Sequence, residues 1–142
     1  TRVARDKDNL YFLVQTAESI TSHTDPGWMW LFLNTDRKRN TGWEGYDYML
    51  NRTSPSSTTI TIERNKGDWK WEKCGEATYK ISGKQMEIKI PRALLSLKDQ
   101  KLNFEFKWTD NIQQAGDIMD FYISGDAAPA GRFNFVYQEE NQ

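Results

Sequence analysis

Residues 28–52 read WMWLFLNTDRKRNTGWEGYDYMLNR and predict two β-strands joined by a polar loop that contains glycines. Side chains alternate between the two faces of a strand, so Trp28, Trp30 and Phe32 share one face and apolar residues also occupy the other. One face is expected in the core. The second is either an exposed aromatic row of the kind that stacks on flat ligands such as sugar rings, or it is buried as well. For Phe32 we expect a place in the core.

The composition is that of one globular domain spanning residues 1–142. Hydrophobic residues make up 37% and charged residues 27% of the chain, and the aromatic content of 13%, with six Trp, favours a β-rich binding surface. The net charge of −1 gives no overall field that would attract nucleic acid or an anionic membrane. No apolar run has the length of a membrane span, and the single Cys74 excludes an internal disulfide.

The start of the chain, TRVARDKDNLYF, enters a strand almost at once. We therefore expect a fragment of a longer, multidomain polypeptide, in which the absence of a signal peptide says nothing about export.

Strand patterns recur along the chain. Residues 102–109, LNFEFKWT, alternate most clearly, with Phe104, Phe106 and Trp108 on one face and Glu105 and Lys107 on the other. Only residues 91–97, PRALLSL, look helical, as one short turn led by a proline. These patterns predict an all-β fold, an antiparallel β-sandwich of the jelly-roll or immunoglobulin-like kind. The other predicted strands are residues 9–17, 58–64, 76–82, 85–90, 118–123 and 132–137.

Five segments carry a resemblance to a known family. They are DKDNLYFLVQTAES, LFLNTDRKRNTGW, GKQMEIKIPRALLSL, KLNFEFKWTDN and GRFNFVY. In this order, and over nearly the whole chain, they resemble the family-nine carbohydrate-binding modules and the wider DOMON-like β-sandwich domains. The resemblance implies a β-sandwich without catalytic activity, appended to a polysaccharide-degrading enzyme, that binds a sugar, often at a chain end. It also implies a first strand upstream of Thr1, and structural calcium is common in the family.

The resemblance also implies a set of binding residues. In that family the sugar lies on a concave sheet face between two tryptophans, with polar side chains reaching its hydroxyls. Trp28 falls near the position of the first tryptophan. The second falls in the loop before the last strand, where this chain has GDAAPAG, so that either another aromatic, Trp43 or a loop Tyr, substitutes or the sugar function is lost. The implied ligand-binding residues are Trp28, Trp30, Trp43, Asp47, Asn51, Glu105, Lys107 and Asp110.

Metal binding is a separate question. The loop 34–47 offers oxygen donors at close spacing, as calcium requires, but it also carries three consecutive basic residues, and a solvated loop with Asx turns is the favoured explanation. We assign no metal ligand and no required cofactor, and we leave structural calcium open. The donors considered are Asn34, Asp36, Asn40 and Glu44; a second acidic group, Asp117, Asp120 and Asp126, is assigned to turn capping.

Several other functions are disfavoured. Asp47 and Glu105 could form a glycosidase pair, but Lys107 would neutralise it. His23 is far from Cys74 in the sequence, which gives no support for nucleophilic catalysis, and nothing positions His23 with a methionine for haem. The run 66–73, KGDWKWEK, has too little net charge to bind nucleic acid.

The sequence therefore predicts a non-catalytic carbohydrate-binding domain, secreted, periplasmic or at the cell surface as part of a larger protein, and monomeric. Its partner would be a mono- or oligosaccharide or a polysaccharide end. The alternative is a structural accessory domain that packs on its own catalytic domain and binds no sugar. In that case the tryptophan face would be an interface within the polypeptide.

Overall fold

The computed structural model describes residues 1–123, 126–130 and 133–139, and its strands form one antiparallel sheet in the order β1-β2-β7-β6-β5-β4-β3-β8-β10, with β9 paired to β8. This confirms the predicted all-β, antiparallel class. The strands are β1 Arg2–Arg5, β2 Asn9–Gln15, β3 Trp30–Asn34, β4 Tyr48–Leu50, β5 Thr59–Asn65, β6 Trp71–Ser82, β7 Gln85–Pro91, β8 Asn103–Asp110, β9 Asp126–Ala128 and β10 Phe135–Gln138.

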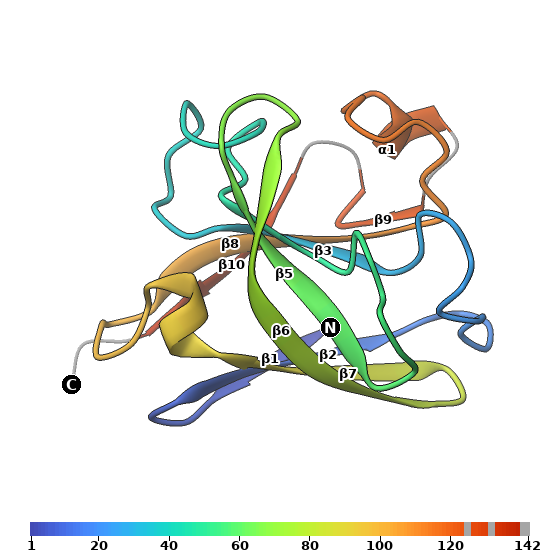
Figure 1. Cartoon of the computed structure of the whole chain (residues 1–142), viewed down its shortest axis with the longest axis horizontal. Coiled ribbons are helices and arrows are strands. Elements are labelled where there is room, and N and C mark those ends of the chain that lie inside the picture. The colour runs from blue at the N-terminus through green and yellow to red at the C-terminus, as the bar shows by residue number, and fades with distance from the viewer. Residues whose placement is uncertain (124–125, 131–132, 140–142) are drawn as a thin grey trace.

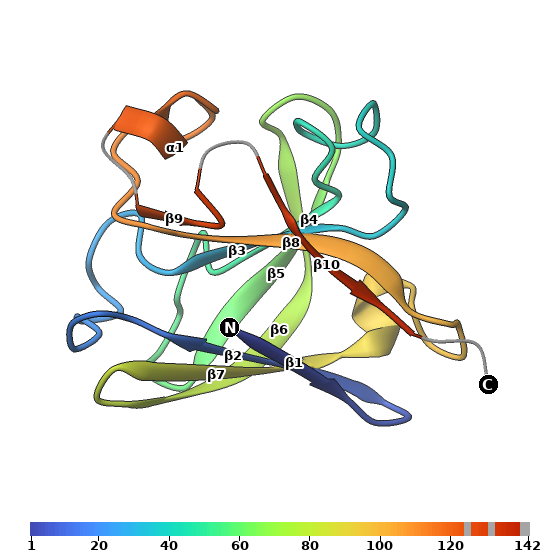
Figure 2. The same ribbon diagram turned by 180° about the vertical axis from the view of Figure 1, so that it is seen from behind.

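The sheet curls over itself, so that its two halves form the layers of a sandwich. Figures 1 and 2 show β1, β2 and β7 in one layer, β3, β8 and β10 in the other, and β5 and β6 running diagonally between them. Phe12 of β2 packs on Phe104 and Phe106 of β8, with ring centroids 5.9 and 5.2 Å apart. The Arg5 guanidinium lies 3.1 Å from the Glu139 carboxylate and ties the beginning of the chain to the end of β10. The two layers are therefore one folded sheet rather than two separate ones.

The main core lies between the layers and follows the predicted alternation. Leu10, Phe12 and Val14 of β2 point inward, as do Phe104 and Phe106 of β8, and all five are buried. Apolar burial of this kind is the dominant stabilising term for such a sheet. The predicted short helical turn is also confirmed, as a 3₁₀ turn at Arg92–Leu95 directly after Pro91.

One predicted element is wrong. Residues 118–123 were expected to form a strand, but Asp120–Ile123 form a single helical turn, α1. The Asp120 carboxylate accepts hydrogen bonds from the backbone N–H groups of Gln113 and Gln114, at 2.8 and 3.2 Å. These bonds fold the segment back on itself, in competition with an extended strand. The predicted last strand is shorter than expected, because β10 begins at Phe135, and residues 131–132 lie outside the described part.

Candidate functional site

The predicted aromatic face exists, but it is covered. Trp30 and Phe32 lie on the outer face of β3, where they belong to a second aromatic cluster with Trp43. The other buried members of this cluster are Tyr46, Met49, Ile112 and Phe121, and Trp69 and Trp71 pack against it. Trp30 is 6% exposed and Trp43 is 7% exposed. The expectation of an exposed aromatic row is therefore wrong at both positions, and the alternative with two buried faces is confirmed.

Loops cover the cluster because the chain folds over the outer face of β3 and β8. The segment that leaves β8 lies directly against a ring of the cluster. A Cβ added at Gly116 would come within 2.9 Å of Trp69, so only glycine allows this close approach. Trp43 packs edge-on against Trp69 with ring centroids 4.6 Å apart. The indole rings are thus used to hold loops in place.

Trp28 does not share a face with Trp30, which corrects the predicted alternation. Met29 has a φ of 47°, a left-handed conformation that breaks the extended backbone, and β3 begins only at Trp30. Trp28 consequently turns into the main core, where it is 2% exposed and packs on Tyr79 at 5.8 Å. Neither Trp28 nor Trp30 offers a free ring face for stacking in this conformation.

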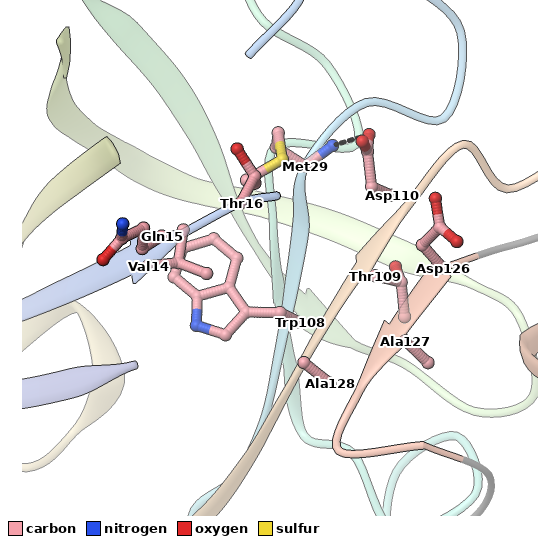
Figure 3. A pocket seen from close by; sticks show the side chains of 10 residues that line it. All are labelled: Val14, Gln15, Thr16, Met29, Trp108, Thr109, Asp110, Asp126, Ala127 and Ala128. Carbon is pink, nitrogen blue, oxygen red and sulfur yellow. Dashed lines mark hydrogen bonds between the residues drawn. The ribbon is translucent and has the colours of Figure 1, made fainter. Parts of the chain in front are cut away.

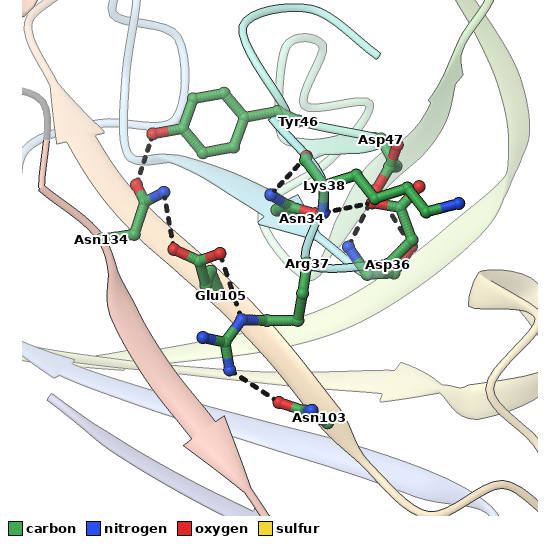
Figure 4. Close-up of polar contacts among 10 residues, drawn as sticks. Asn34, Asp36, Arg37, Lys38, Tyr46, Asp47, Asn103, Glu105 and Asn134 are labelled. Atoms are coloured by element: carbon green, nitrogen blue, oxygen red, sulfur yellow. Dashed lines mark hydrogen bonds and ion pairs between the residues drawn. The ribbon is translucent and has the colours of Figure 1, made fainter. Parts of the chain in front are cut away.

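Glu105 and Lys107 lie on the outer face of β8, as the alternation predicted, and both are buried by contacts within the chain. The Glu105 carboxylate accepts hydrogen bonds from Arg37 Nε at 3.2 Å and from Asn134 Nδ2 at 3.4 Å. Arg37 also donates from Nη1 to Asn103 at 2.8 Å, which extends the network along the strand (Figure 4). These polar groups fasten the 34–47 loop and the residue before β10 to β8.

Lys107 is fully buried, and its ammonium group holds the backbone before β10 in place. Nζ donates hydrogen bonds to the carbonyl oxygens of Pro129 and Phe133, at 2.6 and 2.7 Å, and lies 5.7 Å from the centre of the Phe121 ring. Burial disfavours the charged form and lowers the pKa of Lys107 from 10.5 to about 8. Lys107 therefore holds the backbone before β10 over the outer face.

This lowered pKa predicts how stability responds to alkaline pH. Between about pH 8 and pH 10.5 the unfolded chain keeps the Lys107 proton while the folded protein loses it, so the contribution of Lys107 to the free energy of unfolding rises with pH. Below pH 8 both states are protonated, and this contribution is constant. Urea unfolding of the wild type and of Lys107→Met should therefore show the wild type gaining stability relative to the variant across this window. A constant difference between the two proteins would contradict the lowered pKa.

The remaining predicted site residues hold neighbouring backbone. Asp47 accepts hydrogen bonds from the Thr35 backbone N–H at 2.9 Å and the Thr35 hydroxyl at 3.3 Å, and burial raises the pKa of Asp47. Asn51 Nδ2 donates to the carbonyl oxygens of Trp28 and Met29, at 2.8 and 3.2 Å. Asp110 accepts the backbone N–H of Met29 at 3.0 Å, which supports the strained turn.

The 34–47 loop contains the predicted Asx turn. Asp36 accepts the backbone N–H of Lys38 at 2.9 Å and the Thr41 hydroxyl at 2.8 Å, while Asn34 Nδ2 donates to the Lys38 carbonyl at 2.9 Å. Within the described ranges, no group of three or more His, Cys, Asp or Glu residues is arranged to hold a metal ion. Structural calcium stays a prediction that no contact in the loop supports.

A group of cavities lies elsewhere, at the end of β8. Three adjoining cavities, of about 130, 550 and 240 Å³, have Asp110 and Asp126 among their lining residues, and we call them together the β8-end cleft. The smallest is mainly apolar, with Met29, Trp108 and Ala128 in its wall (Figure 3). The cleft is lined by residues 14–21, 25–26, 28–29, 108–111 and 126–128.

The polar groups of this cleft come from two paired strands and one loop. Asp110 of β8 pairs directly with Asp126 of β9, so both carboxylates lie on the same side of the sheet. Trp28 Nε1 also belongs to a lining residue; it is buried and has no hydrogen-bond partner among the described residues. Thr109 Oγ1 is unpaired too, but its side chain lies on the opposite, outer face of β8, beside Trp30 and Ala127. Such orphaned donors are rare in folded proteins and call for an explanation.

The sequence identified only part of this cleft. Trp28 and Asp110 were predicted as site residues, and both line it. Asp126 was assigned to turn capping, whereas the structure places it in β9, and Thr109 was not considered. The sequence did offer a signal that Asp126 belongs to a site, because Asp126 lies in the loop where the resemblance places the second tryptophan. Part of that loop, residues 124–125 and 131, lies outside the described residues.

Comparison with protein-family models, with curated protein sequences and with solved structures found no match to this chain. In the part of the chain that the structure describes, no helix has the length and apolar character needed to cross a membrane.

Proposed function

We propose that this chain is a non-catalytic carbohydrate-binding domain whose sugar site is the β8-end cleft. The outer face of β3 and β8, which the sequence favoured, is covered by loops. The proposal keeps the predicted ligand class but moves the site from the outer face of β3 and β8 to the cleft at the end of β8. The resemblance to the family-nine modules supports the ligand class, and the geometry of the cleft supports the place.

The observation that carries the proposal is an orphaned donor in a residue that lines a cavity together with two carboxylates. Trp28 Nε1 is buried and unpaired among the described residues, and Trp28 lines the same cavity as Asp110 and Asp126. A sugar hydroxyl both accepts and donates a hydrogen bond. It can therefore accept from the Trp28 N–H and donate to a carboxylate, which satisfies a group that would otherwise stay unpaired.

The shape of the cleft also suits a sugar ring. Its largest cavity, about 550 Å³, falls within the range of roughly 300–1,000 Å³ for small-molecule sites. The adjoining smallest cavity has a mainly apolar wall that can contact the C–H groups of a sugar ring. Strands β2, β8 and β9 supply part of the lining and are already formed, so this part costs little ordering entropy, and we expect a modest affinity.

The test is a titration of the protein with a panel of mono- and oligosaccharides, followed by tryptophan fluorescence and calorimetry. We expect one sugar class to bind saturably, without hydrolysis, and Asp126→Asn to weaken it about fivefold through the loss of one charge-assisted hydrogen bond. Because Asp126 is exposed and forms no ion pair among the described residues, Asp126→Asn should not lower the free energy of unfolding.

Asp68→Asn is the matched control. Asp68 is an exposed carboxylate in the β5–β6 turn that lines none of the three cavities, so this variant should leave sugar affinity unchanged. A folded sample that binds no sugar of the panel would overturn the proposal and favour the accessory domain that packs on a catalytic partner. Equal binding by wild type and Asp126→Asn would remove the cleft as the site.

A further inference from the structure

We propose that strand β10 is an interface at which two copies of this chain pair in antiparallel fashion, so that their sheets join into one. The proposal does not rest on sugar binding. It differs from the monomer expected from the sequence, and it follows from the backbone, the side chains and the charges at one edge of the sheet.

The outer edge of β10 offers backbone groups to a further strand. β10 ends the sheet order, and within the described residues its only strand partner is β8 (Figure 2). The Glu139 N–H donates to the Leu102 carbonyl at 2.8 Å, in the same register as the pairing of β10 with β8. Because hydrogen-bonded pairs alternate along an antiparallel ladder, Val136 and Gln138 direct their N–H and C=O groups away from β8. Such a row of backbone groups is a template for pairing with another chain.

The side chains of β10 lack the features by which sheet edges avoid such pairing. Natural edge strands carry charges, prolines or bulges. Residues 133–138, FNFVYQ, contain no charge, proline or glycine, and Phe133 and Val136 are 77% and 52% exposed. The strand at the other end of the sheet order differs, because β1 begins with Arg2 and ends with Arg5. The unguarded edge is therefore β10, and a strand paired there would cover Val136.

Charge and symmetry favour a second copy of this chain as the partner. In the sequence Arg132 precedes the uncharged run and Glu139 follows it, so antiparallel copies bring unlike charges together, whereas parallel copies bring like charges together. With Val136 of the two copies opposite one another, Asn134 of each copy lies opposite Gln138 of the other, and all three residues form hydrogen-bonded pairs. This contact uses the same patch on both copies and occupies both β10 edges, so association stops at two.

The experiment is analytical ultracentrifugation of the full chain from micromolar to submillimolar concentration. We expect a reversible equilibrium between monomer and dimer, and slower amide hydrogen exchange at Val136 and Gln138 as the concentration rises. Val136→Lys should weaken the dimer at least about tenfold, because it places two like charges opposite each other at the centre of the contact. Its circular dichroism spectrum should match that of the wild type, since Val136 is half exposed.

Val136→Pro is the second variant. It removes only an N–H that points away from β8, a place where edge strands tolerate proline, and it should also abolish the dimer without unfolding the chain. Ala4→Lys is the matched control, because Ala4 is an exposed residue of the other edge strand, β1, and its replacement should leave the equilibrium unchanged.

Three results would overturn the proposal. The first is a wild type that stays monomeric over the whole concentration range, which would leave the β10 edge to a strand from another polypeptide. The second is a dimer that persists in both Val136 variants or that Ala4→Lys disrupts, because its contact would then lie elsewhere. The third is growth beyond two copies into fibrils, which would show open-ended stacking of strands in place of a closed pair.

Discussion

Replacing Phe32 with alanine is expected to lower the free energy of unfolding by about 3–5 kcal/mol. Phe32 is fully buried at the centre of the second aromatic cluster. Its ring lies 5.1 Å from Tyr46, 5.6 Å from Trp43 and 5.6 Å from Phe121. Truncation removes these contacts and leaves a cavity between the sheet and two loops that cover it. Urea unfolding followed by circular dichroism measures the change.

Phe133→Ala is the matched control, because the same truncation is made at a side chain that is 77% exposed. It should change the free energy of unfolding by no more than about 0.5 kcal/mol. Amide hydrogen exchange adds a second measurement: in Phe32→Ala the 35–47 segment should exchange faster than in the control. If Phe32→Ala lowered the free energy of unfolding as little as Phe133→Ala does, the loops would not lie on this cluster. That result would favour the exposed aromatic platform predicted from the sequence.

The alternation of β8 was predictable from sequence because nothing interrupts it. Phe104, Phe106 and Trp108 enter the core, and Glu105 and Lys107 take the opposite face, as a period of two requires. The same rule failed between Trp28 and Trp30. A left-handed φ at Met29 puts Trp28 on the opposite face from Trp30. The sequence does not mark this position, because left-handed conformations favour Gly, Asn and Asp rather than Met.

The cleft was only partly predictable, for a different reason. Asp110 was identified through the resemblance, which matches the end of a recognisable strand, but its place in the cleft depends on Asp126, which pairs with it from a segment assigned to a loop. Pairing between distant segments is set by register and by the loops between them, and neither is written in local composition. The burial of Trp30 and Trp43 has the same origin. Local sequence shows that a strand face is aromatic, but the fold of other segments decides whether that face is open.

Removing the side chain of Lys107 is expected to have the second large effect. Lys107→Ala should lower the free energy of unfolding by about 3 kcal/mol, because it leaves a cavity and deprives the carbonyl oxygens of Pro129 and Phe133 of their donor. Thermal and urea unfolding measure the loss. The segment before β10 should also become accessible to protease, since the two hydrogen bonds hold it against the outer face of β8.

Lys107→Met separates the two contributions. Methionine keeps most of the apolar stem and its packing against Phe121 but cannot donate a hydrogen bond, so it should recover about half of the loss. Burying an ammonium is costly in itself, and that cost, absent in the methionine variant, works against the two hydrogen bonds it makes. If both variants were as stable as the wild type, Lys107 would not be the anchor of this segment. If methionine alone restored full stability, packing of the stem, rather than the ammonium, would hold the loop.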